Sequence, residues 1–149
     1  MLVMKSFKYL LILICIPLLL LNTTCDDDNT DESSCGVPAL VDNSFYEIAE
    51  TDEFNLIDFD LTDDCLTVEV GASGCDGSTW SLVLVDSGDV AESSPEQRFL
   101  KLIFSNDEAC LAVFTQTRIF NLSNLRVEGS NEVILNIEGI DEPLSYMYP

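Results

Sequence analysis

The chain contains no histidine and only six lysine or arginine residues among 149. Without histidine, a serine or cysteine nucleophile has no imidazole base, and an H-E-x-x-H zinc site has no ligands. No two cysteines have the C-x-x-C spacing of zinc and redox sites. These absences exclude most hydrolase mechanisms and argue against a zinc site, so we expect no metal and no cofactor.

Basic residues are also scarce where nucleic acid would need them. Lys5 and Lys8 lie near the start, so from Cys25 onward four basic residues stand against 27 acidic ones, a net charge of −23. Phosphate binding requires a basic surface, and this one would repel DNA and anionic lipid head groups. The sequence therefore excludes nucleic acid, and its acidity favours cationic partners, including Ca²⁺.

No apolar run is long enough to stay in a membrane as a helix. Leu10 to Leu21 is apolar throughout, but it is 12 residues long, whereas a membrane span needs about 20. Lys5 and Lys8 precede this run. A charged start followed by a short apolar stretch is typical of a signal peptide, which we expect to cover residues 1–24 and to be cleaved.

The end of this segment points to lipidation. An Ala-x-Ala cleavage site is missing, and residues 18–25 read LLLLNTTC. They resemble a bacterial lipobox, in which leucine and small residues precede a cysteine that receives a diacylglycerol thioether; Thr24 stands where Gly, Ala or Ser is usual. We expect Cys25 to carry the lipid and to anchor the chain to the membrane, because several acyl chains on one residue give stable attachment.

The residues after Cys25 are strongly acidic. Asp26, Asp27 and Asp28 begin a polar stretch that has no apolar residue before Cys35. Such a segment buries no apolar surface, so residues 25–35 are expected to form a solvated tether. Two interpretations stay open: a spacer, or an export signal, since the run resembles the acidic signal of Bacteroidetes surface lipoproteins. The second implies an outer-membrane, cell-surface location.

Residues 36–149 are expected to form one all-β domain. Apolar residues occur in short runs, never at sustained helical spacing, and alternation places Leu66, Val68 and Val70 on one face. Many short strands predict an antiparallel two-sheet β-sandwich, with an eight-stranded barrel as the alternative. The expected strands are Ser44–Glu47, Phe54–Leu61, Leu66–Val70, Thr79–Val85, Phe99–Phe104, Cys110–Thr117, Glu132–Glu138 and Leu144–Tyr148.

Three segments could be taken for functional motifs, but a structural role is the favoured interpretation of each. Gly71–Gly74 lacks the G-x-S-x-G spacing of a nucleophile elbow and is predicted to be a tight turn. Ile119–Leu125 breaks the alternation and is predicted to be a loop-like crossover that plugs the core and can include a helical turn. Trp80 could stack on a sugar ring, but it is in register with Leu82 and Leu84 and is predicted to lie in the core.

Acidic residues give the remaining site hypothesis. Asp58, Asp60, Asp63 and Asp64 resemble calcium ligand spacing, but no glycine follows at the position that an EF-hand requires. A solvated strand face is the favoured interpretation. Two turn clusters, Asp86 with Asp89 and Asn106 with Asp107 and Glu108, could combine in space to hold a cation.

The cysteines predict two disulfides. Cys35, Cys65, Cys75 and Cys110 remain once Cys15 leaves with the signal peptide and Cys25 is lipidated, and an oxidising envelope favours their pairing. Cys65 opens a strand and Cys75 lies beyond its far end, so their Cα atoms should exceed the limit of about 7 Å for a bridge. Two pairings stay open on this ground.

The order of these motifs resembles a known family. The segments that carry the resemblance are, in order, CLTV at 65–68, GC at 74–75, DEAC at 107–110, FNLSNL at 120–125 and LSY at 144–146. With them the chain resembles small Bacteroidetes lipoproteins with a NigD-like or immunoglobulin-like C-terminal β-sandwich. The resemblance covers Leu56 to Pro149, although the family's histidine after Cys75 is replaced by Asp76-Gly77-Ser78. It implies an immunoglobulin-like sandwich, and it implies that Cys75 pairs with Cys110, which leaves Cys35 to pair with Cys65.

For function, the sequence favours a non-catalytic module. We expect a lipid-anchored envelope or cell-surface protein that binds a protein or glycan or serves as an accessory subunit. The alternative is a small carboxylate-dependent hydrolase acting on glycans, because two of 27 acidic residues can reach a suitable separation.

Overall fold

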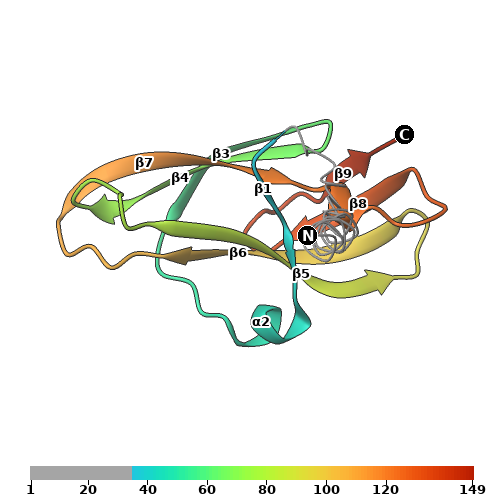
Figure 1. Cartoon of the computed structure of the whole chain (residues 1–149), viewed down its shortest axis with the longest axis horizontal. Helices are drawn as coiled ribbons and strands as arrows, with labels where there is room; N and C mark the ends of the chain where they lie inside the picture. The colour runs from blue at the N-terminus through green and yellow to red at the C-terminus, as the bar shows by residue number, and fades with distance from the viewer. Residues whose placement is uncertain (1–34) are drawn as a thin grey trace, which may run out of the picture. The chain divides into compact units, whose positions relative to one another are not determined.

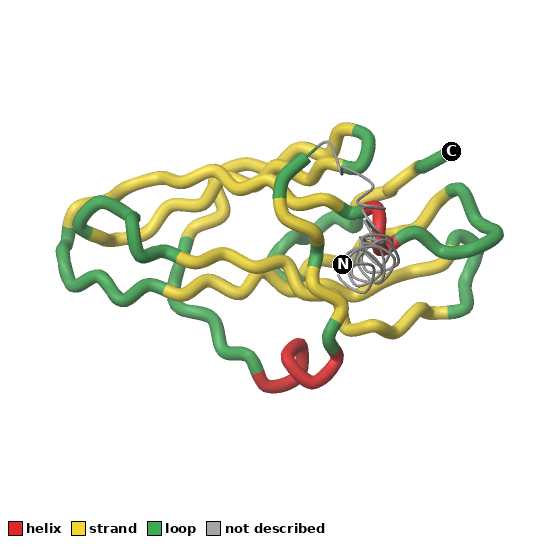
Figure 2. The backbone as a smooth tube through the Cα atoms, in the orientation of Figure 1, coloured by secondary structure: helices red, strands yellow, loops and turns green. Residues whose placement is uncertain are grey.

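Two β-sheets face each other and bury the alternating apolar residues between them (Figures 1 and 2). The structure, a computed structural model, describes residues 35–149. The expected signal peptide, Cys25 and Asp26–Asp28 lie outside the described residues. No helix within 35–149 has the length and apolar character needed to cross a membrane.

Within residues 35–149, sheet A has the strand order β1-β7-β4-β3 and sheet B the order β2-β5-β6-β8-β9. The elements are β1 Val37–Pro38, β2 Leu40–Val41, α2 Asn43–Ile48, β3 Asn55–Thr62, β4 Cys65–Gly74, β5 Ser81–Ala91, β6 Glu96–Ser105, β7 Ala112–Asn121, η1 Ser123–Leu125, β8 Glu132–Ile137 and β9 Leu144–Met147. The all-β sandwich is confirmed.

The sheets are mixed, not purely antiparallel as predicted. β1 pairs parallel with β7, β2 with β5, and β6 with β8. The chain changes sheets between β1 and β2 at Ala39, which is buried and donates its N–H to the Asn121 carbonyl. β8 follows the crossover from sheet A, so no hairpin fixes its direction relative to β6, and a parallel pairing results.

The prediction of a strand at Ser44–Glu47 is wrong, because this segment is helix α2. The carboxylate of Asp42 accepts the N–H of Phe45 at 2.9 Å and caps the first turn. A side chain that satisfies a free N–H at the start of a helix stabilises it by about 1 kcal/mol. Phe45 and Tyr46 are adjacent and both half-buried, so the alternation of a strand is absent here.

The predicted core is confirmed. Leu66, Val68 and Val70 are fully buried. Trp80 is 4% exposed, and its ring meets the ring of Phe104 edge-on at 5.3 Å between centroids. Trp80 therefore belongs to the core and is not a surface platform for a sugar.

Gly71–Gly74 is the end of strand β4, so the predicted tight turn is wrong. A Cβ atom on Gly71 would lie 3.0 Å from the Ile57 side chain, and one on Gly74 would lie 3.0 Å from the Trp80 ring. These small residues continue the strand because they leave room for their bulky neighbours. The turn comes later, around Gly77 with φ +72°.

The crossover predicted at Ile119–Leu125 is right in part: residues 119–121 are the end of strand β7, so the loop begins only at Leu122. Phe120, Leu122 and Leu125 are buried at this end of the core, and Ser123–Leu125 forms a single turn of 3₁₀ helix. The N–H of Leu122 donates to the Asp64 carbonyl at 2.8 Å and fixes the segment against the β3–β4 turn.

The described residues contain the disulfides Cys35–Cys65 and Cys75–Cys110, with Cα atoms 5.8 Å and 4.8 Å apart. This is the pairing that the family resemblance implied. Strand β4 runs the whole way from Cys65 to Gly74, so Cys65 and Cys75 lie at opposite ends of it. The geometric argument against a bond between those two residues therefore holds.

Candidate functional site

The Cys75–Cys110 disulfide joins two loops at one end of the sandwich, on the left in Figure 1. Loop 75–80 connects β4 to β5 and thus sheet A to sheet B, and loop 106–111 connects β6 to β7 in the opposite direction. Gly74 pairs with Ala112, and Ser81 pairs with Ser105. Four strand ends therefore bring the two loops together, and we call this part the disulfide end.

Glu108 holds the two loops together through hydrogen bonds. Its Oε2 accepts the N–H groups of Cys75, Asp76 and Gly77, the last two at 3.1 Å. Its Oε1 accepts the hydroxyl of Thr79 at 3.2 Å. Successive N–H groups that converge in a turn form a concave site for an anion, and here the protein's own carboxylate occupies it.

These donors change the acidity of Glu108. Partial desolvation raises its pKa, but the N–H groups of Gly77, Cys75, Asp76 and Thr79 outweigh this and lower the pKa to about 2. Hydrogen bonds to the charged form of a carboxylate have this effect. Glu108 is therefore an ionised structural anchor at neutral pH, and the opposite of a general acid, which needs a raised pKa.

Asn106 positions Glu108 and connects the loop to the rest of the domain. Its side chain donates to the Ser73 carbonyl at 2.8 Å and accepts the N–H of Glu108 at 2.9 Å. Its own N–H donates to the Asp52 carboxylate at 2.8 Å. Asp52 belongs to the segment between α2 and β3, so three separate parts of the chain meet beside the disulfide.

A groove of about 440 Å³ lies between these parts. Among the described residues, the acidic Asp52, Glu53 and Glu108 line it and no basic residue does; its other lining residues are Asn55, Ala72, Ser73, Asn106, Ala109, Cys110 and Leu111. A groove of one charge sign attracts ligands of the opposite sign. The lining therefore fits a cationic group.

Apolar residues border the groove. Residues 109–113, with the sequence ACLAV, are all exposed, and Leu111 and Val113 are 91% and 75% exposed. Exposed apolar residues are ordinary when scattered, but a contiguous run beside a polar groove is typical of an interaction site. The disulfide end thus combines an apolar rim with an acidic groove.

The two acidic turn clusters predicted from the sequence do not combine. Asn106, Asp107 and Glu108 lie at the disulfide end, whereas Asp86 lies within β5 opposite Leu100, roughly 17 Å along the strand from Ser81. Asp86 is fully buried and pairs with Arg98 at 2.8 Å. Burial raises its pKa, although the N–H of Gly88 and the charge of Arg98 act in the other direction.

The other acidic candidates are distributed along an edge. Asp58 and Asp60 are exposed on strand β3, as the solvated strand interpretation predicted. Asp63, with φ +52°, and Asp64 form the turn that follows. Within residues 35–149, no group of three or more Asp, Glu, Cys or His side chains is arranged to hold a metal ion.

Sequence reasoning missed the role of Asp64. Its two carboxylate oxygens accept hydrogen bonds from Arg126 Nη2 at 2.7 and 2.8 Å, and one of them also accepts a hydrogen bond from the Tyr146 hydroxyl. Burial opposes ionisation, but the bonds from Arg126 and Tyr146 lower the pKa of Asp64. This cluster ties the β3–β4 turn to β9 far from the disulfide end, and separations of 62 and 82 residues left no local signal of it.

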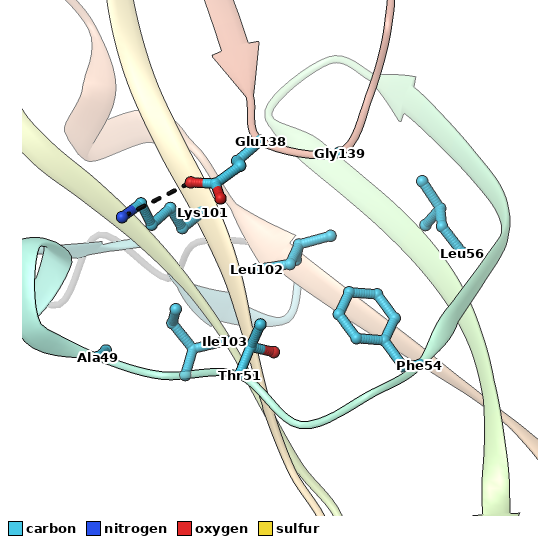
Figure 3. Close-up of a pocket in the computed structure, with 9 residues that line it drawn as sticks. All are labelled: Ala49, Thr51, Phe54, Leu56, Lys101, Leu102, Ile103, Glu138 and Gly139. Atoms are coloured by element: carbon cyan, nitrogen blue, oxygen red, sulfur yellow. Dashed lines mark ion pairs between the residues drawn. The ribbon is translucent and has the colours of Figure 1, made fainter.

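A second hollow, of about 330 Å³, lies beside the segment that connects α2 to β3. Figure 3 shows the Lys101–Glu138 ion pair, at 3.6 Å, on one side and Phe54 and Leu56 on the other. The Lys101 ammonium also donates a hydrogen bond to the Tyr46 carbonyl at 3.1 Å and lies 4.4 Å from the centre of the Tyr46 ring. Because its cation is already paired, this hollow is a weaker candidate than the groove.

The chain matches no family model and no curated protein. Among solved structures it is similar to a NigD-like immunity protein from Bacteroides caccae, with 9% identity, 74% of this chain and 58% of that chain covered, and a TM-score of 0.54. It is also similar to a protein of unknown function from Bacteroides vulgatus, with 16% identity, 76% of this chain and 58% of that chain covered, and a TM-score of 0.51.

These similarities show that the chain shares its fold with these two Bacteroides proteins, and they show nothing about activity, because the identities are low. The chain spans less than two thirds of the length of either solved structure.

Proposed function

We propose that this protein is a lipid-anchored, non-catalytic binding module of the outer membrane, exposed at the cell surface, and that it binds a cationic segment of a protein partner. The anchor is Cys25 and the export signal is Asp26–Asp28, both argued from the sequence. The observation that supports a binding role is the disulfide end, where an acidic groove adjoins the exposed rim of residues 109–113.

The geometry of the groove supports binding over catalysis. Hydrolysis of a glycoside needs one carboxyl group with a raised pKa beside a second that is ionised. Glu108 in the groove has a pKa of about 2, and Asp86, whose pKa is raised, is fully buried away from it. Glu108 therefore cannot serve as the acid that a hydrolase of this kind would use, and hydrolysis of glycans is the weaker alternative.

A protein partner fits the groove better than a glycan does. Sugar sites usually offer an aromatic ring for stacking, and no aromatic side chain lines the groove among the described residues. The exposed Leu111 and Val113 offer an apolar contact that a protein can bury. One similar solved structure is described as a NigD-like immunity protein; a protein of that kind would also act by binding a protein partner.

Site-specific photo-crosslinking in intact cells tests the proposal. A photoreactive amino acid at Leu111, 91% exposed, should give one defined adduct with a protein, whereas the same group at Met147, 71% exposed on β9, should not. Asp52→Asn with Glu53→Gln should weaken the Leu111 adduct, and Asp141→Asn with Glu142→Gln, an equal charge change elsewhere, should leave it. Identical adducts from Leu111 and Met147, or turnover of a glycan by the purified protein, would contradict the proposal.

A further inference from the structure

Strand β7 has an open side along most of its length. It pairs with β4 from Ala112 to Asn121, but it pairs with β1 only at Phe120 and Asn121. In Figure 1, β7 (orange) runs on to the left-hand end of the domain, well beyond β1 (cyan). Among residues 35–149, no strand therefore pairs with the outer side of β7 from Ala112 to Ile119.

The register identifies the backbone groups on that side. The Asn121 carbonyl points toward β1, because it accepts the N–H of Ala39 at 2.9 Å. Backbone groups of alternate residues point to the same side of a strand. The N–H and C=O groups of Val113, Thr115 and Thr117 therefore point to the open side, and those of Phe114 and Gln116 point to β4. Unpaired groups in such a row can accept another strand.

The other sheet edges carry the usual protection against strand pairing, and this one does not. β3 has Asp58, Asp60 and an irregular register between Leu56 and Asp58, and β9 is four residues long. Within the described part of the chain, β5 lacks a strand partner on the side of β2 over the four residues Ser81–Leu84 and again from Ser87 to Ala91, where Asp89 and an irregular register with β6 interrupt the edge. By contrast, residues 112–117 of β7 contain no charge and no proline, and their register with β4 is unbroken.

Residues 35 and 36, which precede β1, do not continue along the open side of β7. Gly36 has φ +52°, and a Cβ atom there would lie 1.9 Å from the Ile119 carbonyl oxygen. Cys35 is bonded to Cys65 on β4, which lies on the other side of β7 from β1. Cys35 and Gly36 thus lead across β7 and not along its open side.

We propose that the open side of β7, from Ala112 to Thr117, binds an extended, non-acidic segment of a partner protein as an added strand. Residues 35–149 carry 22 acidic and four basic residues, so a second copy of the domain would meet a strongly like-charged surface, whereas a basic segment would be attracted. The exposed side chains of Val113, Thr115 and Thr117 offer the apolar and β-branched surface that cross-strand neighbours prefer.

Amide hydrogen exchange on the full-length chain in detergent tests the proposal. In the free protein, Val113, Thr115 and Thr117 should exchange rapidly, while Phe114 and Gln116, bonded to β4, exchange slowly. The probe is a blocked peptide of about ten residues with alternating Thr and Val and a lysine at each end. Its addition should slow exchange at Thr115 and Thr117 at least about ten-fold, the factor that corresponds to one good hydrogen bond.

A pair of variants at one position gives the control. Thr115→Pro removes an N–H from the open side, where proline is tolerated in an edge strand, and Thr115→Val keeps that N–H and the β-branched shape. The proline variant should bind the peptide at least about ten-fold more weakly, and the valine variant as well as the parent. Slow exchange at Gln116 in both variants verifies that the pairing with β4 is intact.

Four results would overturn the proposal. Slow exchange at Thr115 and Thr117 in the free monomer would mean that the chain covers its own edge. Protection that rises with protein concentration without peptide would mean that a second copy does so. Equal peptide affinity for Thr115→Pro and Thr115→Val would place the peptide elsewhere, and no slowing at any peptide concentration would exclude strand addition. None of these results depends on the Leu111 crosslink, so the groove and the edge can fail separately.

Discussion

Removing the disulfides one at a time separates the stability of the domain from the integrity of the groove. Cys35 and Cys65 close a loop with a sequence separation of 30, and Cys75 and Cys110 one of 35. The chain-entropy relation for these loops gives about 3.7 and about 3.8 kcal/mol of stabilisation at 25 °C. Replacing either pair with serine should therefore lower the free energy of unfolding by nearly the same amount, and lower Tm by about 15 °C for a domain of this size.

The two loops do not overlap in the sequence, so their effects should add. Loss of both disulfides should cost about 7.5 kcal/mol, a large part of the 5–15 kcal/mol that is typical of a domain, and the variant without both should be mostly unfolded. Urea unfolding monitored by the fluorescence of Trp80 measures each step. A loss below about 1 kcal/mol for either pair would refute the reasoning.

The same variants should differ at the groove. Loss of Cys75–Cys110 frees loop 106–111 from loop 75–80 and should abolish the Leu111 crosslink, even where the protein is still folded. Loss of Cys35–Cys65 affects the opposite end of β4 and should leave the crosslink unchanged. Equal loss of the crosslink in both variants would show that stability alone controls it.

Three further predictions concern the anchor, the export signal and Glu108. Cys25→Ser should release the protein from the membrane or prevent its maturation, as shown by fractionation; normal membrane attachment would contradict lipidation at Cys25. Replacing Asp26, Asp27 and Asp28 with alanine should lower cleavage by protease added to whole cells while attachment persists, and unchanged cleavage would reduce the run to a spacer. The pKa of Glu108 is lowered from 4.5 to about 2, so the stability that its hydrogen bonds contribute is fully present above pH 4.5 and is lost as the pH falls toward 2. Amide exchange at Gly77 should rise over that range, and should be pH-independent there in Glu108→Gln after correction for intrinsic exchange rates.

The parts of the fold that follow a local rule could be predicted from the sequence. Alternation located the buried faces of β4 and β5, because the side chains of a strand alternate between core and solvent. Helix α2 was missed because its apolar residues are few and its signal is a single cap at Asp42. The parallel pairs were missed because they join strands distant in the chain, such as Glu96 with Val133, and no turn between them records the direction.

The groove shows why a site of this kind is hard to predict. Its components were recognised separately: Asn106 to Glu108 as an acidic turn, and Cys75 and Cys110 as a bonded pair. What makes it a groove is the approach of Asp52 and Glu53, whose position depends on the unpredicted helix α2 and on a hydrogen bond between Asp52 and Asn106, 54 residues apart.

The open side of β7 poses a different problem, because alternation gives the same pattern for a central strand as for an edge. Only the register with β1, set by Gly36 and by the bond from Cys35 to Cys65, determines where the pairing of β1 with β7 ends. The sequence does contain one usable signal: β7 is uncharged from Ala112 to Thr117 in a chain where acidic residues are common elsewhere. An edge strand that is free of charge, against the composition around it, lacks the usual protection against pairing, and a site for strand addition requires such an edge.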